Sequence, residues 1–196
     1  MREIVAIVSG VIIFASAIPY IIDTVKGKTK PNVVSWFTWT LIAAIGTFAA
    51  LSEGAVTSAI LTGADTLGIL AITILALRFG FSRYTFFDAA CQVVALIGVG
   101  LWLITSEPVI ALAIAVAIDF VALMPTLRHA WRLPYEETWS TFALSAFAAG
   151  LVVFTVPELS FVALAYPLYL VIGNLAPTIV ILYRRRIVLA TQDVND

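Results

Sequence analysis

Three polar residues lie near the middle of long apolar segments, where polar side chains are rare. Asp65 and Asp119 are carboxylic acids, and Asn174 carries an amide. A charged side chain at the centre of a bilayer costs at least about 2.5–3.5 kcal/mol on insertion scales. No lysine or arginine lies at the same depth to pair with either aspartate. Each carboxyl group is therefore expected either to carry a proton or to line a watery cavity in which it meets a cation.

The two aspartates also allow a purely structural interpretation. Each could accept a hydrogen bond from a nearby hydroxyl group and so hold two helices together, with Thr62, Thr66 and Ser145 as partners. Intramembrane carboxyl groups are more often functional than structural. We therefore predict that Asp65 and Asp119 are proton-coupling residues, and that Asp65 also binds a solute.

Aromatic side chains recur at helical spacing in two of the apolar segments. Trp36 and Trp39 lie three residues apart, and so do Trp139 and Phe142. Tryptophans near a membrane boundary usually anchor the interface, and we interpret Trp36, Trp139 and Trp102 in this way. Trp39 and Phe142 lie one turn deeper than their neighbours, so both are predicted to stack on a ring or a cationic group of a solute.

The last apolar segment has the features of a helix that lines a cavity. Tyr166 and Asn174 project roughly toward one side of a helix, with Tyr169 beside them. Pro167 and Pro177 each remove a backbone hydrogen bond and permit a kink. An asparagine in a membrane helix can also simply bridge two helices. We predict that Asn174 and Tyr169 bind the solute.

The composition excludes several classes of protein. Hydrophobic residues make up 62% of the 196 residues and charged residues 12%, and the mean hydropathy is +1.06. A soluble domain averages about 45–50% apolar and about 25% charged, so this chain must have lipid as its solvent. A net charge of −1 argues against nucleic acid as a partner. The single cysteine excludes an intrachain disulfide and a thiolate metal cluster, and the single histidine excludes a multi-histidine metal site. We predict that the chain binds no metal or cofactor and is not an enzyme.

Seven apolar segments are long enough to cross a membrane, since a helix needs roughly 20 apolar residues to span the hydrocarbon. Lipid offers no backbone hydrogen-bond partners, so each segment is predicted to be an α-helix and the fold all-α. The predicted spans lie near 4–22, 33–52, 55–78, 84–104, 108–127, 138–157 and 159–183.

The basic residues are distributed unevenly between the loops. In a seven-span chain, ten of the eleven lysines and arginines fall on one face and only Arg2 on the other. The opposite loops carry Glu53, Glu107 and Glu158. Cytoplasmic loops carry the excess of positive charge, so the N-terminus is predicted outside and the C-terminus in the cytoplasm. The ten residues are Lys26, Lys28, Lys30, Arg78, Arg83, Arg128, Arg132, Arg184, Arg185 and Arg186.

An internal repeat relates the two halves of the chain. Pro19 recurs as Pro125 after 106 residues, and Trp36 recurs as Trp139 after 103. In each copy the proline is near the end of one helix, a polar loop follows, and P-x-x-x-[S/T]-W opens the next helix. We predict that the two prolines are hinges. The predicted organisation is a three-helix bundle at 1–80, a linker helix at 81–106, a second three-helix bundle at 107–186 and a cytoplasmic tail at 187–196.

This arrangement resembles the SWEET and PQ-loop (MtN3-like) transporter superfamily, in which two parallel three-helix bundles are joined by a linker helix (3-1-3). Members often have Pro-Gln at the end of the first helix of each bundle, whereas here the pairs are Pro19-Tyr20 and Pro125-Thr126. Sugar carriers of the family place an asparagine in the third helix of each bundle. Asn174 matches this pattern, and Asp65 stands at the matching place in the first bundle.

The resemblance implies a secondary carrier in a plasma or inner membrane that moves a small polar solute by alternating access. Sugar is the family's usual solute, and the aspartates make an amino acid, an amine or a vitamin equally reasonable. The expected partners are the solute and the lipid bilayer, with homo-oligomers left open. The alternative is a seven-helix protein that does not transport, either a receptor or an assembly factor. A retinal receptor needs a lysine in its last span, whereas the lysines here are all at positions 26–30.

Overall fold

The computed structural model describes residues 2–52, 54, 56–81, 84–105, 107–155 and 161–193, and these residues form helices and short connections without a strand. Six helices are long and apolar enough to cross a membrane, and α6 is shorter. The chain is therefore an all-α membrane protein, as predicted. The helices are α1 (Arg2–Val25), α2 (Val33–Ser52), α3 (Val56–Phe79), α4 (Phe86–Ile104), α5 (Pro108–Arg132), α6 (Trp139–Val153) and α7 (Phe161–Asp193), with a 3₁₀ turn at Pro134–Glu136 before α6.

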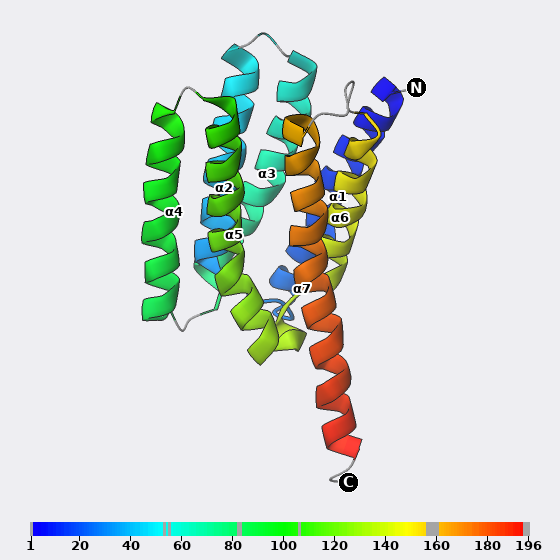
Figure 1. Cartoon of the computed structure of the whole chain (residues 1–196). Helices are drawn as coiled ribbons and strands as arrows, with labels where there is room; N and C mark the ends of the chain where they lie inside the picture. The colour runs from blue at the N-terminus through cyan, green and yellow to red at the C-terminus, as the bar shows by residue number, and fades with distance from the viewer. Residues whose placement is uncertain are drawn as a thin grey trace.

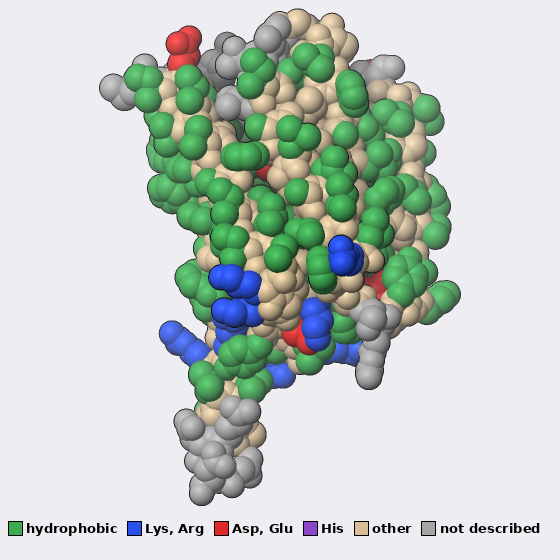
Figure 2. Space-filling view, turned by 180° about the vertical axis from the view of Figure 1, so that it is seen from behind, with side chains coloured by type: hydrophobic (Ala, Val, Ile, Leu, Met, Phe, Trp, Pro, Cys, Tyr) green, Lys and Arg blue, Asp and Glu red, His purple; other side chains and the backbone are tan. Residues whose placement is uncertain are grey.

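The outer faces of the helices carry large apolar side chains that only lipid can cover. Phe48 is 71% exposed, Leu77 is 75% exposed and Ile104 is 78% exposed. Figure 2 shows hydrophobic side chains over the whole height of the bundle above the basic residues. Apolar surface of this extent is unfavourable in water, so the chain is a multi-pass membrane protein.

The packing contacts of the first half of the chain recur in the second half. The helix α3 packs against both α1 and α2, and α7 packs against both α5 and α6. Between the halves, α1 packs against α6 and α2 packs against α5. Exchanging α1, α2 and α3 for α5, α6 and α7 leaves these contacts unchanged. The remaining helix, α4, packs against α5 and α2 and lies at one edge of the bundle (Figure 1).

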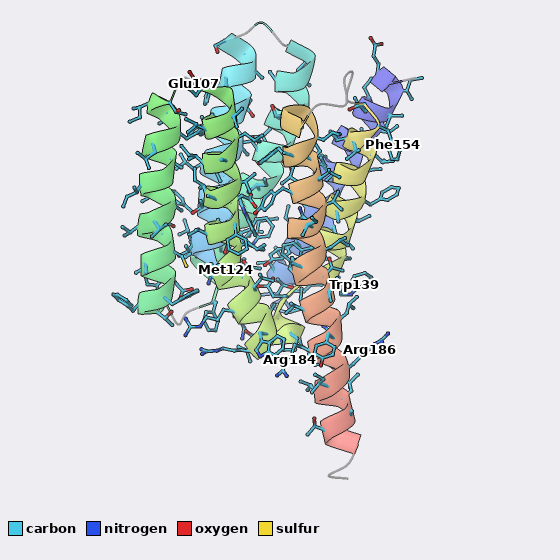
Figure 3. The ribbon with its side chains drawn as sticks, viewed as in Figure 1. Glu107, Met124, Trp139, Phe154, Arg184 and Arg186 are labelled. Atoms are coloured by element: carbon cyan, nitrogen blue, oxygen red, sulfur yellow. The ribbon has the colours of Figure 1, made fainter. Side chains whose placement is uncertain are left out.

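The two ends of the bundle differ in charge. The described N-terminal and C-terminal residues lie at opposite ends of the bundle (Figure 1), and Lys and Arg side chains gather toward the end from which α7 projects (Figure 2). We call this the basic end. Arg83, Glu53 and Glu158 lie outside the described residues. Figure 3 places Glu107 and Phe154 at the opposite end from Arg184 and Arg186.

Both repeat prolines lie inside helices. The helix α1 continues past Pro19 to Val25, and α5 continues past Pro125 to Arg132. The prediction that these helices end near residues 22 and 127 was therefore too short. A proline inside a helix removes one backbone hydrogen bond and permits a bend. The lower part of α5 bends toward α7 close to Met124 (Figure 3).

The two last helices differ most from their predicted lengths. The helix α6 has 15 residues and ends at Val153, and its predicted continuation through 157 is a turn at Phe154–Thr155 followed by residues outside the described part. The helix α7 has 33 residues, about 50 Å at 1.5 Å per residue, which exceeds the roughly 30 Å of the hydrocarbon. It continues to Asp193, so residues 187–193 of the predicted tail are helical (Figure 1).

The start of α4 shows how the sequence fixes a helix end. Thr85 precedes the helix with extended backbone, and its side chain accepts a hydrogen bond from the Asp88 amide. The Asp88 carboxylate in turn accepts from the Thr85 amide at 2.8 Å. This reciprocal pair is a capping box. Asn32 at the start of α2 donates to the other oxygen of Asp88 at 3.1 Å, so the cap also ties α4 to the loop before α2.

Candidate functional site

A cavity of about 580 Å³ lies in the middle of the bundle. All seven helices contribute side chains to its lining. Small-molecule sites in proteins have volumes of about 300–1,000 Å³, so this cavity has room for a solute of ordinary metabolite size. Its lining reaches from Trp36, near the basic end of α2, to Ala111, near the opposite end of α5.

The cavity is lined by most of the residues that the sequence predicts to bind a solute or to couple protons. Its lining includes Asp65 on α3, Asp119 on α5, Asn174 on α7, Trp39 on α2 and Phe142 on α6. Five residues from five helices therefore share one space, although up to 135 positions separate them in the sequence.

Tyr169 is placed one layer behind the cavity wall. It is not among the described lining residues, but its hydroxyl group donates a hydrogen bond of 2.8 Å to the Oδ2 atom of Asp119. The Trp39 indole also interacts with this carboxyl group. Tyr169 therefore orients Asp119, and its predicted contact with a solute stays a prediction.

One aromatic residue, Tyr166, lies close to both aspartates. Tyr166 lines the cavity and lies within electrostatic range of both Asp119 and Asp65. No lysine, arginine or histidine occurs among the described residues of the lining. The cavity is therefore a site with two carboxyl groups, one amide and several hydroxyl groups, and without a cationic side chain in its described wall.

Two of the hydroxyl groups that could have paired with the aspartates have other partners. The Thr66 hydroxyl lies 3.1 Å from that of Thr47 and also donates to a backbone carbonyl. The Ser145 hydroxyl lies 2.9 Å from that of Ser16 on α1. These contacts join α2 to α3 and α1 to α6 without using either carboxyl group. The structural interpretation of the aspartates therefore loses these two partners.

Asn174 is bound within its own helix. Its side-chain amide donates to the Leu170 carbonyl at 2.9 Å, and its backbone carbonyl accepts from the Thr178 hydroxyl at 2.9 Å. The described contacts of Asn174 therefore do not bridge two helices. A side chain that is held against its own helix and lines a cavity is placed to meet a solute.

The basic-end wall of the cavity contains aromatic rings packed in tilted and edge-to-face pairs, which we call the aromatic cluster. The ring centre of Trp36 lies 4.6 Å from that of Tyr20, 5.2 Å from that of Trp39 and 6.4 Å from that of Phe142. Trp36 is only 4% exposed, so its interpretation as an interface anchor was wrong. Trp102 also lines the cavity, unlike a residue confined to the interface.

Tyr20 connects the aromatic cluster to the buried acid Glu137. The Trp36 indole donates to the Tyr20 hydroxyl at 3.2 Å, and that hydroxyl donates to the Oε2 atom of Glu137 at 2.7 Å. Glu137 is 1% exposed, and its Oε1 atom has no partner among the described residues. Burial raises the pKa of Glu137 to about 8, against an ordinary value of 4.5.

The loops of the two repeat copies meet directly at the basic end. The hydroxyl groups of Thr29 and Thr138 lie 2.6 Å apart, and the backbone amide of Lys30 donates to the Glu136 carbonyl at 3.0 Å. The side chains of Lys30 and Glu136 also form an ion pair. We call these contacts the interloop contact. The interloop contact lies beyond the aromatic cluster, at the basic end of the bundle.

The residues of the interloop contact were not predicted from the sequence. The acids Glu136 and Glu137 follow Pro134 in one repeat copy, and Thr29 and Lys30 precede Pro31 in the other. The opposite charges of Lys30 in one loop and Glu136 in the other are the signal that could have indicated a contact between the loops.

Comparison with known proteins does not identify the chain. No protein-family model matches it, and neither the curated proteins nor the solved structures give a significant match. The functional argument therefore depends on the cavity and its surroundings.

Proposed function

We propose that this protein is a secondary carrier that binds a small polar solute in the central cavity and moves it by alternating access. One observation carries the proposal: a solute-sized cavity between the two halves of the chain that contains Asp65, Asp119 and Asn174. Carriers built from repeats bind their solute near the bilayer midplane at the interface of those repeats.

The packing supports a 3-1-3 organisation of the SWEET and PQ-loop kind. The same contacts occur in both halves, and the contacts between the halves are related by exchange of the two triplets. An approximate two-fold axis along the membrane normal gives this pattern, and a single linker helix between the triplets keeps them parallel. The helix α4 would be that linker, because it packs at one edge of the bundle (Figure 1).

The closed basic end supports alternating access. A carrier must close one side of its site while the other side is open. In our proposal the aromatic cluster and the interloop contact form the closed side. In our proposal the basic end faces the cytoplasm and the N-terminus lies outside, since cytoplasmic loops carry the excess of Lys and Arg. A cytoplasm-dependent reporter fused after Asp196 is then active, whereas one fused before Met1 is inactive.

Solute uptake into proteoliposomes tests the carrier function. The purified protein is reconstituted, and uptake of labelled sugars, amino acids, amines and vitamins is measured with and without an imposed pH gradient. We expect protein-dependent uptake of at least one solute class, which Asn174→Ala abolishes and Glu107→Gln, an exposed residue outside the cavity, leaves unchanged. If no solute enters faster than in empty liposomes, the chain is a receptor or an assembly factor instead.

A further inference from the structure

The charge and shape of the cavity restrict its solute further than its size does. Two carboxyl groups, Asp65 and Asp119, line the cavity, whereas none of its described lining residues is cationic. An anion entering this space finds no cationic partner in the described wall, and an ionised Asp65 or Asp119 repels it more strongly at low dielectric constant than in water. A phosphate or a carboxylate is therefore a poor solute for this site.

The aromatic content of the wall points in the same direction. Trp36, Trp39, Trp102, Phe142 and Tyr166 all line the cavity. The face of an aromatic ring attracts a cation, and tryptophan does so most strongly. A wall with several aromatic rings and two acids can hold an ammonium group on one side and an apolar body on the other.

The surroundings of the two acids differ and indicate which of them binds the charge. Asp119 accepts a hydrogen bond from Tyr169 at 2.8 Å and interacts with the Trp39 indole. Donors of this kind hold a carboxylate in one orientation and stabilise its charge. Asp119 is therefore the better-oriented of the two carboxyl groups, and Trp39 beside it supplies an aromatic face for the same cation.

We infer that the cavity takes an organic cation that lacks a carboxylate, namely an amine with an apolar or aromatic body. This inference rests on the proposed carrier function, because it names the solute class of the same cavity. A zwitterionic amino acid is disfavoured, since its carboxylate finds no cationic partner in the described wall. A neutral sugar can pack on the rings and donate hydrogen bonds to the acids, but it gains no charge–charge attraction from either acid.

Three probes with the same aromatic body separate these possibilities. They are 2-phenylethylamine, which is a cation, phenylalanine, which is a zwitterion, and 2-phenylethanol, which is neutral. Binding is measured by quenching of tryptophan fluorescence in nanodiscs of phosphatidylcholine, whose zero net charge does not attract the amine. We expect the amine to bind at least about tenfold more tightly than either analogue, as a carboxylate and aromatic faces together would provide.

Variants assign this preference to the acids. Asp119→Asn should reduce the ratio of amine to alcohol affinity to near one, Asp119→Glu should restore part of it, and Asp65→Asn should reduce it less. Glu107→Gln removes an exposed carboxylate outside the cavity and should leave the ratio unchanged. Thermal melting of each variant shows whether it is folded.

Several results would overturn the inference. The alcohol or phenylalanine could bind as tightly as the amine, the preference could survive in both asparagine variants, or none of the three probes could bind. Any of these outcomes rejects a cation site while uptake of a sugar or another solute in the proteoliposome assay still supports a carrier. Absence of uptake for every solute class rejects the carrier itself, so the two failures are distinguishable.

Discussion

At the residue scale, the polar groups of this protein fall into two sets with different surroundings. The first set lines the cavity and consists of Asp65, Asp119 and Asn174. The second is Glu137, which is buried at the basic end beside Tyr20. The first set can meet a solute or water. Glu137 instead accepts a hydrogen bond from Tyr20 on one oxygen and has no described hydrogen-bond partner on the other. We therefore expect its protonation state to affect the packing at the basic end.

The raised pKa of Glu137 predicts a pH-dependent stability. Burial raises it from 4.5 to about 8, so the folded protein binds a proton that the unfolded chain releases between these values. The contribution of Glu137 to the free energy of unfolding is therefore fully present below pH 4.5 and is lost as pH rises toward 8. We expect Glu137→Gln, which keeps an acceptor for Tyr20, to flatten this decline in melting temperature measured in detergent.

Asp23→Asn is the matched control for this experiment. Asp23 accepts a hydrogen bond from Thr138 at the same end but is only half-buried. This variant should keep the wild-type decline with pH. An equal slope in wild type and Glu137→Gln would show that Glu137 is not the titrating group.

At the element scale, the prolines and the length of α7 are the informative features. The helices α1 and α5 continue beyond Pro19 and Pro125, so neither proline ends its helix. The bend of α5 near Met124 brings its last turns toward α7 (Figure 3). A bend at a missing backbone hydrogen bond is a site at which the helix can change direction at low cost.

Pro125→Ala tests the proposed hinge. Alanine restores the missing amide and favours a straight helix, so movement of the basic end should slow. Accessibility is followed with Ala43→Cys, a cavity position at mid-height of α2, in a Cys91→Ser background. We expect labelling by an impermeant thiol reagent from the basic side to fall severalfold, while Pro167→Ala, a proline without a repeat partner, has a smaller effect. Equal effects of both variants would contradict a special hinge at Pro125.

The elements were predictable from the sequence to different degrees. Lipid demands long apolar helices, so the starts of α2 and α5 matched the hydropathy pattern. The last turns of α7 were missed because Arg184–Arg186 end the apolar run without ending the helix. The role of Trp36 was missed because a tryptophan near a helix start has the same pattern whether it faces lipid or packs in the core. Only the fold brings Tyr20, Phe142 and Trp39 around it.

At the scale of the whole molecule, the cavity and its closure form one system. Asp65 and Asp119 could be singled out from the sequence, because a carboxyl group inside the membrane carries a high free-energy cost and usually marks a functional site. Their convergence could not be predicted without knowing that α3 and α5 both border the same space. The interloop contact was equally hidden, since Thr29 and Thr138 are 109 residues apart in the sequence.

The central claim is that the cavity opens alternately to the two sides of the membrane. The most direct measurement is the rate at which an impermeant maleimide modifies Ala43→Cys, in a Cys91→Ser background, from each side of oriented membrane vesicles. We expect rapid modification from the side opposite the basic end and slow modification from the basic side. Tyr20→Phe removes the hydroxyl that joins Trp36 to Glu137, so it should raise the basic-side rate severalfold and lower the opposite rate. Modification from one side only, in both proteins, would contradict alternating access.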